Sequence, residues 1–416
     1  MNYFHYKNNE LFCENVPVKK LAEMYGTPLY IYSKNFLINQ YENFNSALNE
    51  LDKLICFATK SNSNLTIIKT FADLGAGFDI VTGGELFRII KAGANPEKVV
   101  FSGVGKTKEE IKYAIENNIL FFNVESEVEL KRINHIAGAL NKKTRFCVRV
   151  NPDVDPKTHK YITTGKSENK FGLDFEAAKL LYIHAKNYEN VDAVGVQMHI
   201  GSQITTTDPF VKAIKKLFKL VNVLRNQNVN IQYVDIGGGL GIIYKDEKPP
   251  SPEEFAAAVV PELKKFNAKI IFEPGRFLVG NGGILVTEVQ YVKKTATKEF
   301  VIVDAGMNDL MRPSLYDAYH EIIPVTASEN TKKVDVVGPI CESSDFFGTE
   351  RELPANINSG DFIALNSAGA YGFVMASNYN TRPRGAEVLV NGESAEIIRE
   401  KETLEQLIAN EAIRLF

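Results

Sequence analysis

Lys60 and Glu273 are the side chains whose types and positions first indicate chemistry. Lys60 follows an apolar run, KLICFA at 53–58, and a lysine held partly out of water can act as an amine nucleophile. Glu273 begins the segment EPGR, and a buried carboxylate there could keep the ring nitrogen of a cofactor protonated. Two simpler interpretations stay open: Lys60 can be a solvated strand cap, and Glu273 can form an ion pair with Arg276.

A glycine-rich run between these side chains indicates a phosphate site. Residues 235–241 read DIGGGLG, and glycines such as Gly238 and Gly239 let backbone N–H groups approach a phosphate closely. The run alone is a weak signal, because glycines after a strand often form only a tight turn. It gains weight from Gly275 and Arg276 one unit later, which add a second glycine turn and a charge. An amine, a carboxylate and a phosphate site are the parts that pyridoxal phosphate (PLP) requires.

His199, in HIGSQ, allows two interpretations. It can be a satisfied histidine at a strand end, or its ring can stack on the cofactor. A metal site is not expected, because no second histidine lies at metal-binding spacing.

Eight short apolar or β-branched runs must position these groups, and helical patterns such as 84–92, 125–140 and 208–226 separate them. The expected strands are 53–58, 77–81, 98–101, 119–124, 144–150, 192–198, 230–236 and 268–272. Eight parallel strands with seven helices between them predict a (β/α)8 barrel, in which catalytic groups follow the strand ends. An open, doubly wound sheet is the competing arrangement.

A second, β-rich domain of the sandwich or barrel type is expected after the barrel, which makes the chain an α/β protein of two domains. Residues 283–396 carry short alternating strands, and a helix is expected at 401–411. The segment LYIYS at 29–33 can add a strand to this domain. We expect the cofactor-binding barrel to span 32–278, and the β-rich domain to comprise 1–31 and 279–416.

Composition excludes several classes of partner. The formal net charge is −3, with 48 basic and 51 acidic residues interspersed, so nucleic acid and anionic membrane surfaces are not expected partners. No run approaches the length of a spanning helix, and the N-terminus lacks the layout of a signal peptide. The four cysteines are too scattered for a disulfide framework. We therefore expect a cytoplasmic protein that acts on small molecules.

These motifs together resemble those of the fold-type III PLP-dependent decarboxylases, and most closely the members that act on diaminopimelate. The resemblance extends over nearly the whole chain, and the motifs of the second domain are the specific ones, because the barrel motifs are shared with ornithine and arginine decarboxylases. The motifs are the Lys60 segment, GAGFDIVTGGEL at 75–86, NKFGL at 169–173, HIGSQ at 199–203, DIGGGLG at 235–241, EPGR at 273–276, DAGMNDLMRPSLYDAYH at 304–320, GPICESSD at 338–345 and AGAYGF at 368–373.

The resemblance implies an alanine-racemase-like barrel followed by a β domain, and a homodimer with active sites at the subunit interface. Cys341 and Glu342 of the partner subunit would then complete each site. The implied catalytic residues are Lys60, which holds PLP as a Schiff base, and Cys341, which protonates the carbanion. The implied cofactor-binding residues are Lys60, Asp79, His199, Ser202, Gly238, Gly239, Glu273, Gly275, Arg276 and Tyr371. The implied substrate-binding residues are Arg276, Arg312, Tyr316, Glu342 and Tyr371.

Arg312 and Glu342 are the residues that best discriminate between substrates. Diaminopimelate keeps a carboxylate and an ammonium group at the end that does not react, and an arginine with a glutamate can bind that pair. Ornithine has only an amine at its far end. Alternatives remain at two positions: Arg312 can form a surface ion pair with Asp309 or Asp317, and Cys341 can be a buried, inert cysteine.

The reaction that the resemblance implies is decarboxylation of meso-2,6-diaminopimelate at its D-configured carbon to give L-lysine and CO2, the last step of lysine biosynthesis. The rival activities are decarboxylation of ornithine, arginine or carboxynorspermidine, and a rival of another class is a non-catalytic, decarboxylase-like binding protein. Two small departures from the family pattern remove no chemical group. Thr59 and Ser61 replace the more usual Val and Ala, and Ser344 replaces a common Gly.

Overall fold

The structure is a computed structural model that describes residues 3–155 and 170–414. The chain divides into two compact units. The barrel unit comprises Ile38–Ile242 and Glu247–Leu278, and the β unit comprises Met1–Leu37, Ile243–Asp246 and Val279–Phe416. Asn169, the first residue of the NKFGL segment, lies outside the described residues.

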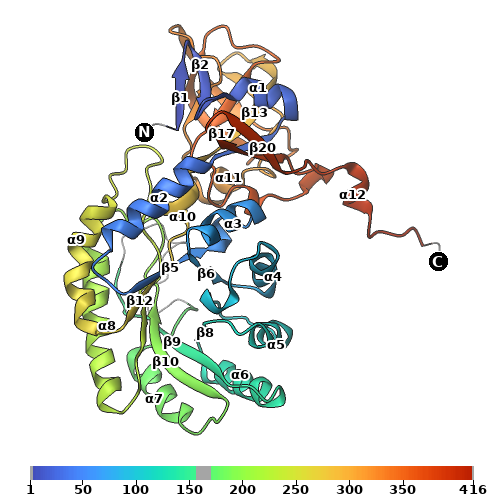
Figure 1. The fold of residues 1–416 in the computed structure, drawn as a ribbon. Helices are drawn as coiled ribbons and strands as arrows, with labels where there is room; N and C mark the ends of the chain where they lie inside the picture. The colour runs from blue at the N-terminus through green and yellow to red at the C-terminus, as the bar shows by residue number, and fades with distance from the viewer. Residues whose placement is uncertain (1–2, 156–169, 415–416) are drawn as a thin grey trace. The chain divides into compact units, whose positions relative to one another are not determined.

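Parallel strands form a closed barrel in the barrel unit (Figure 1). These strands are β5 (Lys53–Ala58), β6 (Gly77–Ile80), β7 (Val99–Phe101), β8 (Phe121–Val124), β9 (Thr144–Val150), β10 (Val191–Met198), β11 (Tyr233–Asp235) and β12 (Lys269–Phe272). The last strand, β12, pairs in parallel with the first, β5, so that Ile270 lies opposite Lys53. This pairing excludes the open sheet and confirms the predicted (β/α)8 barrel.

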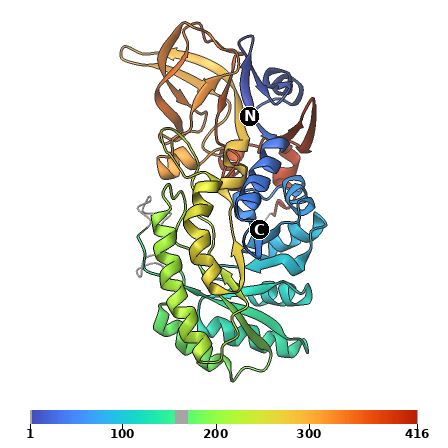
Figure 2. The same ribbon diagram turned by 60° about the vertical axis from the view of Figure 1, so that its left-hand side comes forward.

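A helix follows each of the first seven barrel strands, as the sequence pattern predicted. These helices are α3 (Leu65–Asp73), α4 (Gly83–Lys91), α5 (Lys108–Glu116), α6 (Glu127–Ala139), α7 (Phe175–Ala185), α8 (Asp208–Asn226) and α9 (Pro252–Leu263). All but α8 begin after an Asn, Thr, Ser or Asp whose side chain accepts a backbone N–H of the first turn, which starts each helix at a defined residue. Helices α8 and α9 pack side by side on the outside of the barrel (Figure 2).

The barrel interior changes from apolar to polar along its strands. One half holds an apolar cluster that includes Cys56, Val100, Phe121, Cys147 and Ile271. Because alternate residues of a strand face the same side, the next inward positions lie two residues further on. Those positions carry Ser102 after Val100, Asn123 after Phe121 and Glu273 after Ile271. The polar end is therefore the C-terminal end of the strands, where barrel enzymes place their active sites.

The β unit contains a nine-stranded sheet and a small three-stranded sheet. The larger sheet consists of β4 (Leu29–Ser33), β13 (Gly283–Lys294), β14 (Glu299–Val303), β15 (Ile322–Pro324), β16 (Thr331–Val337), β17 (Phe346–Pro354), β18 (Phe362–Leu365), β19 (Ala386–Asn391) and β20 (Ser394–Arg399). The smaller sheet consists of β1 (Phe4–Lys7), β2 (Glu10–Cys13) and β3 (Val16–Pro17). Strand β4 pairs with β13 and with β19, so the LYIYS segment does add a strand to this unit.

Sequence patterns missed the short elements of the β unit. Helix α1 (Val18–Tyr25) and helix α11 (Arg312–Tyr316) were not predicted. The helix predicted at 401–411 was too long, because α12 spans only Leu404–Ile408. That segment buries no residue, and a short helix without packing partners is marginal in water.

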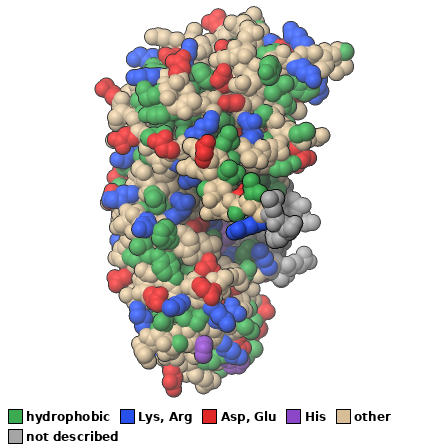
Figure 3. All heavy atoms as spheres, turned by 90° about the vertical axis from the view of Figure 1, so that its right-hand side faces the viewer, with side chains coloured by type: hydrophobic (Ala, Val, Ile, Leu, Met, Phe, Trp, Pro, Cys, Tyr) green, Lys and Arg blue, Asp and Glu red, His purple; other side chains and the backbone are tan. Residues whose placement is uncertain are grey.

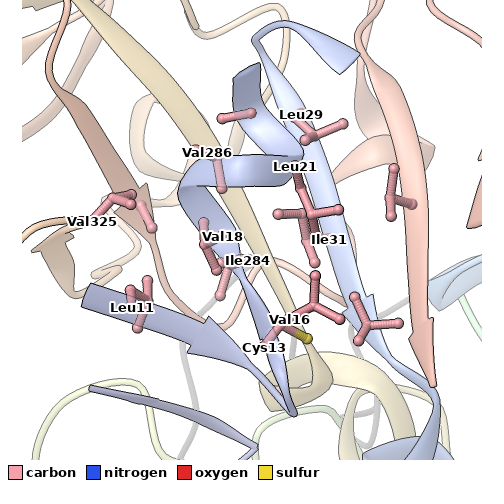
Figure 4. Packing of buried hydrophobic residues seen from close by; sticks show 14 of the residues in the cluster. Leu11, Cys13, Val16, Val18, Leu21, Leu29, Ile31, Ile284, Val286 and Val325 are labelled. Atoms are coloured by element: carbon pink, nitrogen blue, oxygen red, sulfur yellow. The ribbon is translucent and has the colours of Figure 1, made fainter. Parts of the chain in front are cut away.

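An apolar cluster joins the N-terminal segment to the main sheet of the β unit (Figure 4). Val18 and Leu21 of α1 pack against Leu29 and Ile31 of β4, and Ile284 of β13 belongs to the same cluster. Because these residues come from both ends of the chain, the N-terminal segment is an integral part of the β unit.

The molecular surface in Figure 3 carries acidic and basic side chains interspersed, without a single-sign patch on the face shown. Within the described ranges, no helix combines the length and the apolar character that crossing a membrane requires. In the same residues, His, Cys, Asp and Glu side chains form no cluster of three or more that could hold a metal ion.

Candidate active site

Lys60 lies at the polar end of the barrel, in a 3-10 turn (Thr59–Ser61) that directly follows β5. Its Nζ atom lies 2.9 Å from Oδ2 of Asp79, which is in β6 and fully buried. The Lys60 side chain is 37% exposed, so the amine is accessible from outside while it is paired inside. A simple solvated strand cap does not describe this lysine.

Glu273 lies in a layer of buried polar side chains that cross the barrel. Nδ2 of Asn123 lies 3.5 Å from Oε1 of Glu273 and 3.5 Å from Oδ2 of Asp235. Nε2 of Gln197 donates to Oε2 of Glu273 at 3.3 Å. Arg276 instead donates to Ser202, so the structure does not show the ion pair between Glu273 and Arg276 that the sequence allowed.

Burial and like charges disfavour ionisation of these carboxyl groups. Burial raises the pKa of Glu273 well above its usual value, and the neighbouring carboxyl groups of Asp235 and Asp79 raise it further. Burial likewise raises the pKa of Asp235 to about 7, although the Gly237 N–H bonded to its carboxylate lowers it in part. Carboxyl groups that face one another cannot all be charged without a cation nearby. The cluster is therefore suited to a cationic group.

His199 follows β10 as a neutral ring. Burial lowers its pKa well below the usual value, and the charges of Arg149 and Lys60 act in the same direction. The Gly238 N–H donates to Nδ1 of His199 at 3.3 Å, so the ring proton is on Nε2. A neutral, oriented imidazole at this position can present its face to a flat ring.

The predicted phosphate ligands lie together after β10, β11 and β12. Nη2 of Arg276 donates to Oγ of Ser202 at 3.1 Å. A Cβ atom on Gly238 would lie 2.2 Å from the backbone oxygen of Glu273, and one on Gly239 would lie 2.4 Å from the oxygen of Gly201. Gly239 also has a φ of +113°, which favours glycine. These glycines are needed for close packing of the three loops, beside which a hydroxyl and a guanidinium group are available for an anion.

The residues of the barrel unit fit PLP. Lys60 provides an amine for the aldehyde, Glu273 provides a carboxyl group for the ring nitrogen, and Arg276 with Ser202 provides donors for the phosphate. Beside Glu273, the buried Oδ1 of Asn123 and Oε1 of Gln197 have no hydrogen-bond partner within the described residues. Acceptors of this kind, next to an excess of carboxyl groups, favour a ligand that carries N–H donors and positive charge.

Arg312 belongs to the β unit and begins helix α11. It is 7% exposed, so the surface ion pair with Asp309 or Asp317 does not describe it. Oδ2 of Asp309 accepts from the Gly306 N–H at 2.9 Å. The guanidinium group of Arg312 contacts Tyr244 and His320 of the same unit.

Cys341 and Glu342 lie on an exposed loop of the β unit, between β16 and β17. Cys341 is exposed, whereas the other three cysteines are buried, so it is not the inert, buried type. The Tyr379 hydroxyl donates to Oε2 of Glu342 at 3.0 Å. The loop is fixed below this point by Asp345, whose carboxylate accepts the N–H groups of Met307 and Ile340, each at 2.6 Å.

The two tyrosines predicted to contact ligands lie at turns in which a non-glycine residue has a positive φ. Tyr316 is the last residue of α11 and is followed by Asp317 in the left-handed conformation. Tyr371 itself has a φ of +56°, which is unusual for an aromatic residue. Such strain is often found where a side chain must be aimed at a functional site.

The replacement of Gly by Ser344 is accommodated, because Ser344 has no positive φ and its backbone oxygen accepts a hydrogen bond from the Ser314 hydroxyl.

Several polar residues that contact the predicted site residues were not predicted from the sequence. These are Asn123, Gln197 and Asp235 in the barrel, and Tyr244 and His320 beside Arg312. A signal was available for the first three, because each is a polar residue at an inward-facing position of an otherwise apolar strand. His320 ends the motif at 304–320 and was given no role there, whereas nothing local marks Tyr244, because its contact with Arg312 depends on the tertiary fold.

The chain is similar to pyridoxal-dependent decarboxylases over nearly its whole length. A family model described as the pyridoxal-binding domain of pyridoxal-dependent decarboxylases matches residues 35–280. The chain is 50% identical over 408 residues to a diaminopimelate decarboxylase of Aquifex aeolicus, covering 98% of this chain and 96% of that protein. A crystal structure of diaminopimelate decarboxylase from Helicobacter pylori with L-lysine is 43% identical with a TM-score of 0.91, covering 94% of this chain and 98% of that one. The corresponding M. jannaschii complex with L-lysine is 39% identical with a TM-score of 0.95, covering 99% and 98%.

Proposed function

The chain belongs to the diaminopimelate decarboxylase family of pyridoxal-dependent decarboxylases, and on that premise we propose that it converts meso-2,6-diaminopimelate into L-lysine and CO2. This reaction is the last step of lysine biosynthesis. The observation that carries the choice of substrate is the buried Arg312, which offers a fixed cation to a carboxylate at the end of the substrate that does not react. Relatives whose structures contain L-lysine, the expected product, support the same choice.

The barrel residues hold the cofactor. When bound, PLP supplies a ring that accepts the electron pair left behind as CO2 departs. Lys60 would hold the cofactor through its side-chain amine, and Asp79 would pair with that amine when it is not bonded to the cofactor. Glu273 would keep the ring nitrogen protonated, and Asn123 and Gln197 hold the Glu273 carboxyl group in place. His199 would present its face to the cofactor ring. The phosphate would be held by Ser202, Gly238, Gly239, Gly275 and Arg276, with Tyr371 as a further contact.

The β unit selects the amino acid. Arg312 binds the carboxylate at the non-reacting end, and Glu342 binds the ammonium group beside it. Tyr316, Tyr371 and Arg276 line the rest of the substrate. Because these groups bind the L-configured end, the D-configured carbon is left at Lys60 and loses its carboxyl group. Ornithine, which has no carboxylate at its far end, would leave the buried Arg312 without an anion.

Cys341 returns a proton to the carbon that has lost CO2. Its thiol is exposed on a loop beside Glu342, which suits a group that reaches a site on another subunit. The active form is a homodimer in which Cys341 and Glu342 of the partner subunit complete each site. In domain terms, we assign cofactor binding to residues 32–278, apart from 32–37 and 243–246, which belong to the β unit, and completion of the site to residues 1–31 and 279–416. A cytoplasmic location is supported by the free thiols of all four cysteines, which are typical of a reducing compartment.

Turnover by the PLP-loaded protein on a panel of amino acids tests this function. We expect CO2 and L-lysine from meso-diaminopimelate, and rates lower by about 100-fold or more on ornithine and arginine, since a buried charge left unpaired costs several kcal/mol. Carboxynorspermidine belongs in the panel as the remaining rival substrate. Activity on ornithine with none on diaminopimelate would contradict the proposal. A yellow chromophore in the purified protein excludes a binding protein that has lost its cofactor.

A further inference from the structure

Arg312 is held by two groups of its own unit that no expected role includes. Nη1 of Arg312 lies 2.8 Å from Nε2 of His320, which is completely buried, and Nδ1 of His320 lies 2.7 Å from the backbone oxygen of Asn366. The Cζ atom of Arg312 lies 4.5 Å from the centre of the Tyr244 ring. That ring also meets the His320 ring edge to face, with centres 5.5 Å apart and planes at 77°.

The chemistry of the partners fixes the proton on the His320 ring. A guanidinium group can only donate hydrogen bonds, so Nε2 of His320 must accept. A backbone carbonyl can only accept, so Nδ1 must carry the hydrogen. His320 is therefore neutral, with its proton on Nδ1, and it links the Arg312 side chain to the backbone at Asn366. A protonated ring would direct an N–H group at the guanidinium cation and break this link.

We propose that His320 is a positioning residue that fixes the Arg312 guanidinium group for the carboxylate of the substrate. The inference rests on the proposed function, in which Arg312 binds the carboxylate at the non-reacting end. Arginine is a long side chain with many rotamers, and a group that is already fixed loses less freedom when it binds. His320 binds Nη1 of Arg312, so the orientation of the other guanidinium nitrogens is set before the ligand binds.

Tyr244 supplies the second constraint. Its aromatic face attracts the guanidinium cation. Together with the hydrogen bond from Arg312 to His320, this contact defines both the position and the plane of the guanidinium group. Tyr244 stands three residues after Gly241, the last glycine of the DIGGGLG run, yet it belongs to the β unit. By fixing Arg312, His320 and Tyr244 favour a ligand that carries a carboxylate beside its amine over a diamine that has no carboxylate.

L-lysine and cadaverine separate this role from a general structural one, because they differ only by the carboxylate. Binding of each to the PLP-loaded protein is followed by the change in cofactor absorbance, and does not require turnover. His320→Asn keeps a donor for Asn366 but does not reach Arg312, so it weakens L-lysine binding about 10-fold, the cost of one charge-assisted hydrogen bond. Cadaverine binding stays within about 2-fold, because cadaverine has no carboxylate for Arg312. His320→Gln can still offer an acceptor to Arg312 and restores L-lysine binding to within about 3-fold of the unmodified protein.

Three further variants keep the test decisive. Tyr244→Leu weakens L-lysine several-fold and spares cadaverine, and it serves if His320→Asn has a lowered unfolding midpoint. His184→Asn, at an exposed histidine on α7, is the matched control and changes neither ligand. Equal weakening of both ligands by His320→Asn, or no change in either, overturns the proposal. Arg312→Gln should weaken L-lysine binding and leave cadaverine binding unchanged. If it affects both ligands equally, the proposed role of Arg312 is wrong, and the role of His320 is wrong as well.

Discussion

The Nζ atom of Lys60 lies 2.9 Å from Oδ2 of the buried Asp79, at the polar end of the barrel. This pair explains how a charged amine can be held at the partly buried end of the barrel. The carboxylate balances the ammonium charge, while more than a third of the lysine side chain remains accessible. The amine can then exchange its ionic partner for a covalent one when an aldehyde arrives.

Lys60→Arg should separate the ionic role of this residue from its covalent role. The guanidinium group keeps the ion pair with Asp79 but cannot form the bond to the aldehyde, so the unfolding midpoint should stay within a few degrees. Borohydride reduction of the PLP-loaded protein should fix the cofactor to the Lys60 peptide, detected by mass spectrometry, and should fix none in the variant. Lys212→Arg, at an exposed lysine paired with Asp208, is the control and should leave labelling intact. Labelling of a different lysine in the unmodified protein would refute the assignment.

Gly238→Ala should damage the phosphate loop. The added Cβ would lie 2.2 Å from the backbone oxygen of Glu273, so the two loops must move apart. We expect the free energy of unfolding to fall by about 1–3 kcal/mol, as for overpacking in other cores, and PLP to bind several-fold more weakly. Chemical denaturation and a PLP titration measure the two effects. Gly105→Ala has nothing within 4 Å of its Cβ and should change neither, so equal effects of the two substitutions would argue against this account of the loop.

Asp235 should make the stability of the cofactor-free protein depend on pH. Its pKa is raised to about 7 by burial, against about 3.9 in the unfolded chain, so between these values the folded state holds a proton that the unfolded state has lost. Stability from this group is therefore fully present below about pH 4 and is lost as the pH rises towards 7, by about 1.4 kcal/mol per pH unit for each proton.

Asp235→Asn should flatten that slope, measured by chemical denaturation of the cofactor-free protein between pH 5 and 8. Glu85 and Asp309 also have pKa values raised to about 7, so the difference between variant and unmodified protein is the relevant quantity. Asp192→Asn, at an exposed aspartate on β10, should leave the slope unchanged. An unaltered slope in Asp235→Asn would mean that this carboxyl group does not retain its proton in the folded state.

Shared active sites in a homodimer predict complementation between two inactive variants. Lys60→Arg removes the cofactor bond, and Cys341→Ala removes the proposed proton donor from the loop that serves the other subunit. A coexpressed mixture should recover about a quarter of full activity, because half of the dimers are mixed and each has one intact site of two. Light scattering on the mixture reports the dimer. A dimeric mixture without activity would show that the sites are not shared, and full activity of Cys341→Ala alone would exclude the thiol as proton donor.

The barrel could be predicted from the sequence to within a few residues, because each strand is an apolar run bounded by turn residues. The run KLICFA matches β5 at both ends, and TRFCVRV matches β9 at both ends. Strand pairing does not follow from such runs, so closure of the ring required the pairing of β12 with β5. The short helix α11 had no local periodicity to predict it, since it spans only Arg312–Tyr316.

The reactive groups of the candidate site could be predicted from the sequence, but the residues that hold these groups in position could not. Lys60, Glu273 and Arg276 stand beside strand ends or glycines, which are visible in a sequence. Asp235 lies beside Asn123, and Tyr244 contacts Arg312. Both contacts join residues far apart in the sequence and so depend on the whole fold. The sequence left open a surface ion pair for Arg312, and the burial that excludes this alternative depends on the tertiary fold.

The central claim is that the β unit binds the L-configured end of diaminopimelate and leaves the D-configured end at Lys60. Its most direct test is turnover of meso-diaminopimelate that carries ¹³C only in the carboxyl group of the D-configured carbon. The account predicts that labelled CO2 is released in equal amount to L-lysine, and that the L-lysine is unlabelled. Label retained in the lysine, or no CO2 from this substrate while ornithine is decarboxylated, would contradict it.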